Sequence, residues 1–283
     1  MLLSTQTAAL QNAFGFEEAV RIIHEAGFDC YDFSMTRMAW EGHPLQRADY
    51  QESVKALRRY ADSIGIPCNQ SHAPFPMHRP DDDAWNKNIH EWCVRSLEIT
   101  ALLGGKICVV HPYNNWTPEE NRDRVYLPLL PYCKKYGVKI AVENMWNWPA
   151  ESPVAVPCAC SLPENFCAHM DLLDPEWFVA CLDIGHAEMF PDKTSAVQLI
   201  HALGDRLQCL HVHDNDRLHD DHGIPFTGKI EWDGVCAALK AIGYKGDFTF
   251  EADTAINKYP DPLKADAEKL LQKTGRYLIN RIG

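Results

Sequence analysis

Five residues of types that bind metal ions lie far apart in the sequence, each at or just beyond the end of an apolar run. Glu143 ends KIAVE, Asp183 and His186 lie in LDIGH, His211 lies in LHVHD, and Glu251 ends FTFE. A carboxylate at such a position is costly to bury unless it is paired or coordinated. A mixture of oxygen and nitrogen ligands suits a hard or borderline divalent cation. The sequence therefore predicts one metal site built from four strand ends.

Further residues of the same kind surround these positions. His72 ends NQSH, His111 lies in VVHP, and Asp220 and His222 lie in the loop after the seventh apolar run. We expect His72 and His111 to contact the substrate or the metal ligands, and Asp220 and His222 to be extra metal ligands. The alternative for each of these side chains is a hydrogen bond to a substrate hydroxyl or, for the histidines, to a backbone carbonyl. Trp146, in the loop after Glu143, is expected to cover a substrate, with packing on the rim as the alternative.

Apolar runs alternate with amphipathic, helix-like segments along the chain. The expected strands are Leu2–Gln6, Cys30–Ser34, Cys68–His72, Ile107–His111, Lys139–Glu143, Ala180–Ile184, Cys209–His213 and Asp247–Glu251. The expected helices between them include Phe16–Ala26, Tyr50–Ile64, Trp85–Leu103, Pro118–Tyr136, Ser195–Leu203 and Trp232–Ile242. Short apolar runs without strict alternation are typical of parallel strands covered by helices. The pattern predicts an α/β fold, a (β/α)₈ barrel, with its functional residues at the C-terminal strand ends.

Composition agrees with this expectation. The 283 residues are 46% hydrophobic and carry a formal net charge of −12, which suits one domain spanning residues 1–283. Because nucleic-acid binding usually needs clustered lysine and arginine, we do not expect a nucleic-acid partner. No apolar run reaches the length of a membrane span, and the start MLLSTQTAALQ lacks the features of a signal peptide. The sequence does not decide between a monomer and a homo-oligomer.

The cysteines favour a cytoplasmic location. The chain has 11 of them, an odd number with irregular spacing. Several lie inside strand-like runs, where a free thiol behaves as a small buried apolar group. A reducing compartment is therefore expected.

In their order and spacing, these motifs resemble the xylose-isomerase-like superfamily of metal-dependent TIM barrels, and within it the sugar isomerase and epimerase group that includes the ketose 3-epimerases. The resemblance covers essentially the whole chain. It implies one divalent ion per chain, Mn²⁺ in the first place, held by Glu143, Asp183, His211 and Glu251. Mg²⁺, Co²⁺ and Zn²⁺ accept the same set of ligands. It also implies that His186 and Arg217 hold the substrate. Where relatives usually have another glutamate, this chain has Pro149.

The resemblance implies chemistry on a ketose or a ketose phosphate. Isomerisation or epimerisation removes a proton from a carbon beside a carbonyl and returns one through an enediolate. A divalent ion stabilises the negative charge that develops, and two carboxylates take and return the proton. We expect Glu143 and Glu251 to be these two groups as well as metal ligands.

Three other functions stay open. A lyase, such as a dehydratase or a C-glycoside-cleaving enzyme, would start with the same proton abstraction. Endonuclease IV, a relative with three zinc ions, has nine ligands that all find a counterpart here: His72, His111, Glu143, Asp183, His186, His211, Asp220, His222 and Glu251. The flanking residues VENMWNW, LDIGH and HVHDND look more like the sugar-isomerase pattern. A barrel that only binds sugar is the third alternative.

Overall fold

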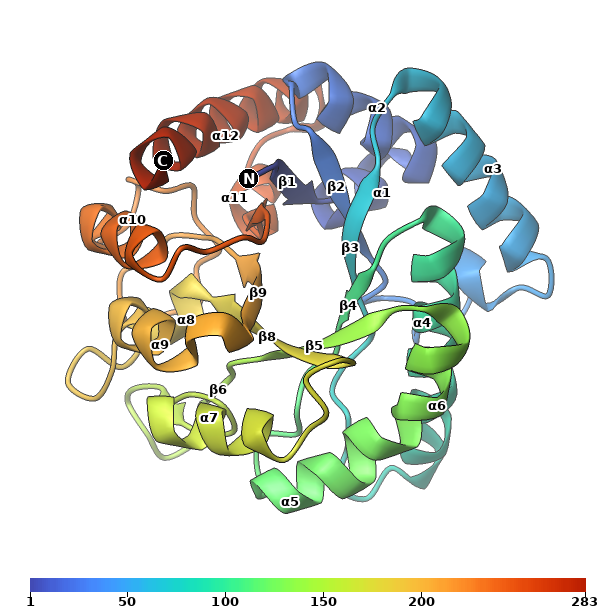
Figure 1. Ribbon diagram of the computed structural model, residues 1–283. Helices are drawn as coiled ribbons and strands as arrows, with labels where there is room; N and C mark the ends of the chain where they lie inside the picture. The colour runs from blue at the N-terminus through green and yellow to red at the C-terminus, as the bar shows by residue number, and fades with distance from the viewer.

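Eight parallel strands form a barrel in the computed structural model, which describes residues 1–283 (Figure 1). The strands are β1 (Leu3–Gln6), β2 (Cys30–Ser34), β3 (Cys68–His72), β4 (Ile107–Val109), β5 (Lys139–Glu143), β8 (Phe178–Asp183), β9 (Leu207–His211) and β10 (Phe248–Phe250). They pair in the order β10-β1-β2-β3-β4-β5-β8-β9. Val212 closes the barrel, since its N–H donates to Thr249 O at 2.9 Å and its carbonyl accepts from Glu251 N at 3.1 Å. The predicted (β/α)₈ fold is confirmed.

Helices form a ring around the barrel (Figure 1). The longer ones are α2 (Phe16–Ala26), α3 (Tyr50–Ile64), α4 (Asp83–Leu103), α6 (Leu127–Tyr136), α7 (Pro163–Asp171), α9 (Ala196–Leu203), α10 (Trp232–Ala241) and α12 (Asp261–Ile282). The shorter ones are α1 (Ala8–Phe14), α5 (Pro118–Asn121), α8 (Ile184–Glu188) and α11 (Asp253–Asn257). The apolar faces of the helices and strands meet in one large core, and a smaller cluster of strand residues is separate from it: Val109, Ala141, Val179, Cys181 and Cys209. Strands covered in this way are buried on both faces, as all six residues of β8 are.

Two strands end two residues earlier than predicted. β4 ends at Val109 and not at His111, because Pro112 has no N–H to continue a ladder. β9 ends at His211 and not at His213, because the chain leaves the barrel to pair Asp214 with Gly223 in an antiparallel bridge. Both histidines therefore lie on loops above the barrel mouth. The other predicted strands agree with the structure to within two residues.

The predicted helix Pro118–Tyr136 is not continuous. A π-helical turn at Arg122–Tyr126 separates α5 from α6. Pro128 and Pro131 follow this turn, and neither can donate a backbone hydrogen bond to the preceding turn of the helix. Wider π turns are a common way to accommodate such a defect. The sequence signal for this break was the pair of prolines.

Two long loops lie over the C-terminal mouth of the barrel, after β5 and after β9. The first contains a small antiparallel pair, β6 (Trp146–Asn147) with β7 (Val156–Pro157). The second is organised by the buried Asp214, whose carboxylate accepts hydrogen bonds from Phe226 N at 2.8 Å and from Trp232 Nε1 at 3.1 Å. Hydrogen bonds within each loop therefore hold both loops in place.

All 11 cysteines are free thiols, and most of them are buried. This agrees with their interpretation as small apolar core residues. None of the helices combines the length and the apolar composition that a membrane span requires.

Helix α12 completes the ring by packing very closely on β1 and β10. A methyl group at Gly275 would lie 2.5 Å from Leu3 Cδ1 and 2.7 Å from Phe250 Cε2. We expect overpacking in Gly275→Ala to lower the free energy of unfolding by about 1–3 kcal/mol. The higher helix propensity of alanine offsets about 1 kcal/mol of this loss.

Gly234→Ala in α10 is the matched control for this substitution. Its nearest neighbour is the flexible carboxylate tip of Glu231 at 3.0 Å, so its effect on stability should be small or favourable. Urea unfolding of both variants measures the contrast. If Gly275→Ala is as stable as Gly234→Ala, the close packing of α12 is not a constraint on the fold.

Candidate metal and active site

Four of the predicted ligands meet at the C-terminal mouth of the barrel. Glu143 and Asp183 are the last residues of β5 and β8, His211 ends β9, and Glu251 follows β10. Ligand atoms of the four side chains lie within 4.8 Å of one another, and all four residues are buried. We call Glu143, Asp183, His211 and Glu251 the strand-end group. The structure brings them together, while their binding of a metal ion stays a prediction.

The strand-end group has short internal contacts and unsatisfied oxygens. His211 Nδ1 lies 2.8 Å from Glu143 Oε1 and 3.0 Å from Glu251 Oε2. Glu143 Oε2 and Asp183 Oδ2 are buried without any hydrogen-bond partner. Buried carboxylate oxygens are rarely left without a donor, because nothing then offsets their lost hydration. These orphan oxygens, beside an imidazole nitrogen, fit a divalent cation.

A second layer of polar side chains supports this group from inside the barrel. Asp32 on β2 is fully buried, and its Oδ2 lies 3.3 Å from His211 Nε2. The same oxygen accepts a hydrogen bond from Gln70 Nε2 at 3.1 Å. Gln6 Nε2 donates to Glu251 Oε1 at 2.8 Å. A carboxylate behind a ligating histidine fixes its ring and raises its basicity. Neither Asp32 nor Gln6 was predicted from the sequence. The available signal was a polar residue inside an otherwise apolar strand.

His72 and His111 lie on the far side of Glu143. His111 Nε2 is 2.8 Å from Glu143 Oε2, and His72 Nε2 is 3.0 Å from His111 Nε2. His72 Nδ1 is bonded to the carbonyl of Ala73 at 2.7 Å. His111 faces a cavity at the barrel mouth, whereas His72 is buried behind it. Of the two, only His111 is therefore placed to touch a substrate.

Asn144 fixes the turn that carries Asp183 and His186. Its side chain accepts from Asp183 N at 2.7 Å and donates to Asp183 O at 2.9 Å. Its backbone carbonyl accepts from His186 Nδ1 at 2.9 Å. The Asp183 carboxylate in turn caps α8 by accepting from His186 N at 2.6 Å. Asn144, the residue after β5, thus positions Asp183 and His186 at the end of β8.

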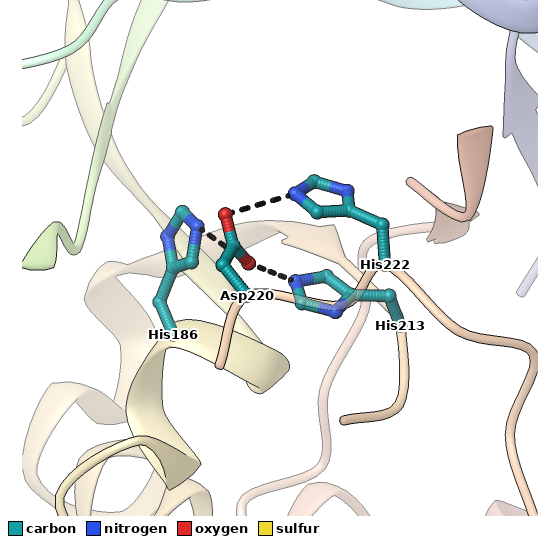
Figure 2. Close-up of side chains that lie close together, drawn as sticks. All are labelled: His186, His213, Asp220 and His222. Carbon is teal, nitrogen blue, oxygen red and sulfur yellow. Dashed lines mark hydrogen bonds and ion pairs between the residues drawn. The ribbon is translucent and has the colours of Figure 1, made fainter. Parts of the chain in front are cut away.

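A separate cluster of ligand types lies beside the strand-end group. It consists of His186 from α8 and of His213, Asp220 and His222 from the loop after β9 (Figure 2). We call these four residues the loop group. Asp220 and His222 are the two extra ligands considered from the sequence, and His186 was expected to hold the substrate. His213 was predicted only as the last residue of a strand.

Charges in both groups are strongly coupled. Burial alone would raise the pKa of the Glu143 carboxyl, but the imidazoles of His211 and His111 lower this pKa well below its usual range. Burial disfavours the charged form of His186, yet the carboxylates of Asp183 and Asp220 raise its pKa to about 10. The carboxyls of Glu143, Glu251 and Asp220, whose pKa values are all lowered by neighbouring imidazoles, are therefore held in their charged form. They need nearby positive charge, from protons or from metal ions.

A cavity of about 510 Å³ opens above the two groups. Glu143, Glu251, His111 and three members of the loop group line it, together with the aromatic rings of Phe75, Tyr113, Trp146 and Trp148. No lysine or arginine is among its lining residues. This volume falls in the range of small-molecule sites.

The loop tryptophans and Arg217 have different positions relative to the cavity. Trp146 lines it and donates from Nε1 to Asp220 Oδ2 at 3.3 Å, while Trp148 stacks on His219 with ring centroids 5.5 Å apart. Arg217 lies outside the lining, with its Nε 3.2 Å from Glu188 Oε2. The structure therefore does not bring Arg217 to the position expected of a substrate ligand. It leaves Trp146 at the predicted place.

Acids and imidazoles gather at the C-terminal mouth of a (β/α)₈ barrel, which is the end where proteins of this fold carry their active sites. Residues 20–275 match the family model described as xylose isomerase-like TIM barrel. The chain belongs to this family.

Known proteins similar to this chain agree with that assignment. The uncharacterized protein y4fM of Sinorhizobium fredii is 25% identical over 280 residues, covering 87% of this chain and 83% of that protein. The solved structure of the IolI protein with a bound zinc atom has a TM-score of 0.77 at 20% identity and covers 100% of this chain and 99% of that one. A D-tagatose 3-epimerase-like protein has a TM-score of 0.72 at 20% identity, with both chains fully covered. These structural likenesses show the fold.

The position of Asp32 behind His211 leads to a prediction about metal affinity. We expect Asp32→Asn to weaken metal binding by about 10- to 100-fold, because a ligating histidine loses the carboxylate that orients it. Competition with a chromophoric chelator measures the change. Asp29→Asn, just before the same strand, removes an ion pair with Arg276 and should leave metal affinity unchanged. Equal affinities in both variants would mean that Asp32 has no role behind the metal ligand.

Proposed function

We propose that this protein is a metal-dependent isomerase or epimerase of a ketose. The observation that carries this proposal is the pair of buried carboxylates, Glu143 and Glu251, which meet beside one imidazole nitrogen and both line a cavity of monosaccharide size. Such a pair can take a proton at one oxygen and return it from another. Membership of the family and the fold shared with sugar epimerases support the same chemistry.

The residues of the strand-end group fit a divalent cation. Ligand atoms of the four residues lie within 4.8 Å of one another, Glu143 Oε2 and Asp183 Oδ2 have no hydrogen-bond partner, and Asp32 lies behind the imidazole of His211. A bound cation supplies positive charge that makes a C–H beside a carbonyl more acidic. Mn²⁺ is the ion that we propose first, and Mg²⁺, Co²⁺ and Zn²⁺ suit the same ligands.

The carboxylates then divide the proton transfer. Glu143 and Glu251 come from β5 and β10, which are separated in the barrel by β8 and β9. Carboxylates that approach from different strands can reach opposite faces of a bound sugar. One, as the carboxylate, removes the proton from the carbon beside the carbonyl, and the other, as the protonated acid, delivers a proton to the opposite face. The lowered pKa values of both carboxyls favour their ionised forms, so the second carboxyl must take up a proton before it can deliver one.

Other side chains are proposed to hold the sugar. His186 and His111 present imidazoles to the cavity, and Trp146 offers an aromatic face for the apolar face of a sugar ring. Because the cavity lining contains no lysine or arginine, we propose an uncharged ketose in preference to a ketose phosphate. Arg217 would need to leave Glu188 to take part.

A lyase remains the second candidate, because the same proton abstraction followed by loss of a β-substituent would use the same groups. The endonuclease IV-like alternative is favoured only by the way eight of its nine candidate ligands fall into clusters at the barrel mouth, with His111 beside Glu143. The formal net charge of −12 and the absence of lysine and arginine from the lining argue against a nucleic-acid substrate. The products formed from a panel of ketoses separate epimerase, isomerase and lyase.

Replacing either carboxylate tests the scheme. Glu143→Gln and Glu251→Gln should each lower kcat by about 10²- to 10⁴-fold, because an amide cannot accept the proton. Exchange of the substrate proton with D₂O, followed by NMR, measures the step directly. Glu176→Gln, an exposed acid at the opposite end of the barrel, is the control and should keep full activity. Near-normal exchange in either site variant would rule out the two-carboxylate mechanism.

Removing metal ions tests the cofactor. Protein treated with a chelator and then freed of it should lose turnover of the ketose, and adding Mn²⁺ should restore it. The expected cause is loss of the positive charge that stabilises the developing oxyanion. Circular dichroism of the chelated protein checks that the barrel is intact. A folded, metal-free protein with undiminished turnover would contradict metal dependence.

A further inference from the structure

Apolar side chains are exposed in a row along α12, one of the helices of the outer ring (Figure 1). Leu263, Leu270 and Tyr277 belong to this helix, and Phe226 packs against Tyr277 with ring centroids 5.8 Å apart. Leu263, Leu270, Tyr277 and Phe226 are 48%, 50%, 53% and 56% exposed. Single exposed apolar residues are ordinary, whereas a group of them on one element marks an interaction surface. We call these four residues the α12 stripe.

The spacing of the stripe is that of a seam between two helices. Leu263, Leu270 and Tyr277 follow one another at intervals of seven residues, which aligns them on one face of α12 over about 21 Å. A different face of the same helix, with Leu271 and Leu278, is buried against the barrel. A helix that only covers a barrel needs one apolar face. The second apolar face of α12 therefore lacks a partner within the chain.

Charges beside the stripe select what can cover it. Asp266 and Lys273 are exposed, four residues before and three residues after Leu270, so they lie on the same side of the helix. Four of the five basic residues of α12 form ion pairs within the chain, and Lys273 is the exception. In an antiparallel pair of α12 helices centred on Leu270, Asp266 of each copy lies opposite Lys273 of the other. A parallel pair would place like charges together, so the charges fit a second copy in one orientation only.

The apolar residues complement one another in the same arrangement. Leu263 and Tyr277 lie seven residues to either side of Leu270, so antiparallel helices place Leu263 of one copy against Tyr277 of the other. Tyr277 lines a shallow hollow of about 450 Å³ together with Phe226 and Lys273, and this hollow can receive the leucine. Leu270 meets Leu270 of the second copy. Every residue of the stripe thereby gains an apolar neighbour.

We propose that the α12 stripe is the interface of a homodimer, in which the α12 helices of two copies pack antiparallel across a two-fold axis at Leu270. An interface of this symmetry uses the same patch twice, and the patch must therefore complement itself. The stripe does so both in its apolar contacts and in its charges. No residue of α12 lines the cavity at the barrel mouth, so the dimer does not depend on the reaction proposed above.

Sedimentation velocity over a range of protein concentrations tests the dimer. The wild type should sediment as a dimer, and Leu270→Glu should raise the dissociation constant by about 100-fold or more, because two carboxylates then meet on the axis. Leu127→Glu is the matched control, since Leu127 is an exposed leucine on α6, and it should leave the dimer unchanged. Circular dichroism checks that each variant is folded. A wild-type chain that sediments as a monomer, whether or not it binds anionic lipid vesicles, overturns the proposal, and so does a dimer that persists in Leu270→Glu.

Charge reversal tests the orientation of the helices. Asp266→Lys and Lys273→Asp each place like charges opposite each other at two symmetric places in the antiparallel dimer, and each should raise its dissociation constant by about 10-fold. The double variant Asp266→Lys/Lys273→Asp restores both pairs of opposite charges and should dimerise as tightly as the wild type. A double variant no tighter than the single variants would refute the antiparallel interface. Neither experiment measures ketose turnover, so failure of the proposed function would leave this result unchanged.

Discussion

The buried charge at the mouth of the barrel is the constraint on which the rest of the structure depends. Glu143, Asp183 and His211 are completely excluded from solvent, and Glu251 is nearly so. Ionised groups in such a place cost several kcal/mol each unless opposite charge and hydrogen bonds compensate. Rigid strand ends and a second layer of polar partners, including Asp32 and Gln6, provide this compensation. A less rigid scaffold would let water in and the carboxylates move apart, and the affinity for a cation would fall with them.

The sequence predicted the barrel well because parallel strands and covering helices leave a regular signal. Short apolar runs alternate with amphipathic segments, and the candidate ligands follow the runs, so converging strand ends follow from the topology. Boundaries failed where local chemistry overrides the pattern. Pro112 ends β4 before His111, and Pro128 and Pro131 break a helix that looked continuous.

The site was only partly predictable, for a physical reason. Strand-end residues are placed by topology, whereas loop residues are placed by bonds that have no sequence period. His213 has a position decided by the missing side chain of Gly185, and Arg217 lies with Glu188, outside the cavity lining. Asp32 could have been suspected, because a lone acid within an apolar strand needs a buried partner. Its partner, His211, becomes apparent only when β2 and β9 face each other inside the barrel.

The segment from Asp183 to His186 links the two groups of ligands. Asp183 offers Oδ2 to the strand-end group, while its Oδ1 lies 3.0 Å from His213 in the loop group and accepts from His186 N. Asn144 holds the same segment from β5 by three hydrogen bonds. Charge placed in one group therefore acts on the other through a single carboxylate whose two oxygens face different neighbours. A substitution at Asp183 disturbs both groups, whereas one at Asp220 or His222 leaves the strand-end ligands in place. The charges of the two groups are coupled for this reason, and a proton gained by one changes the charge that the other must balance.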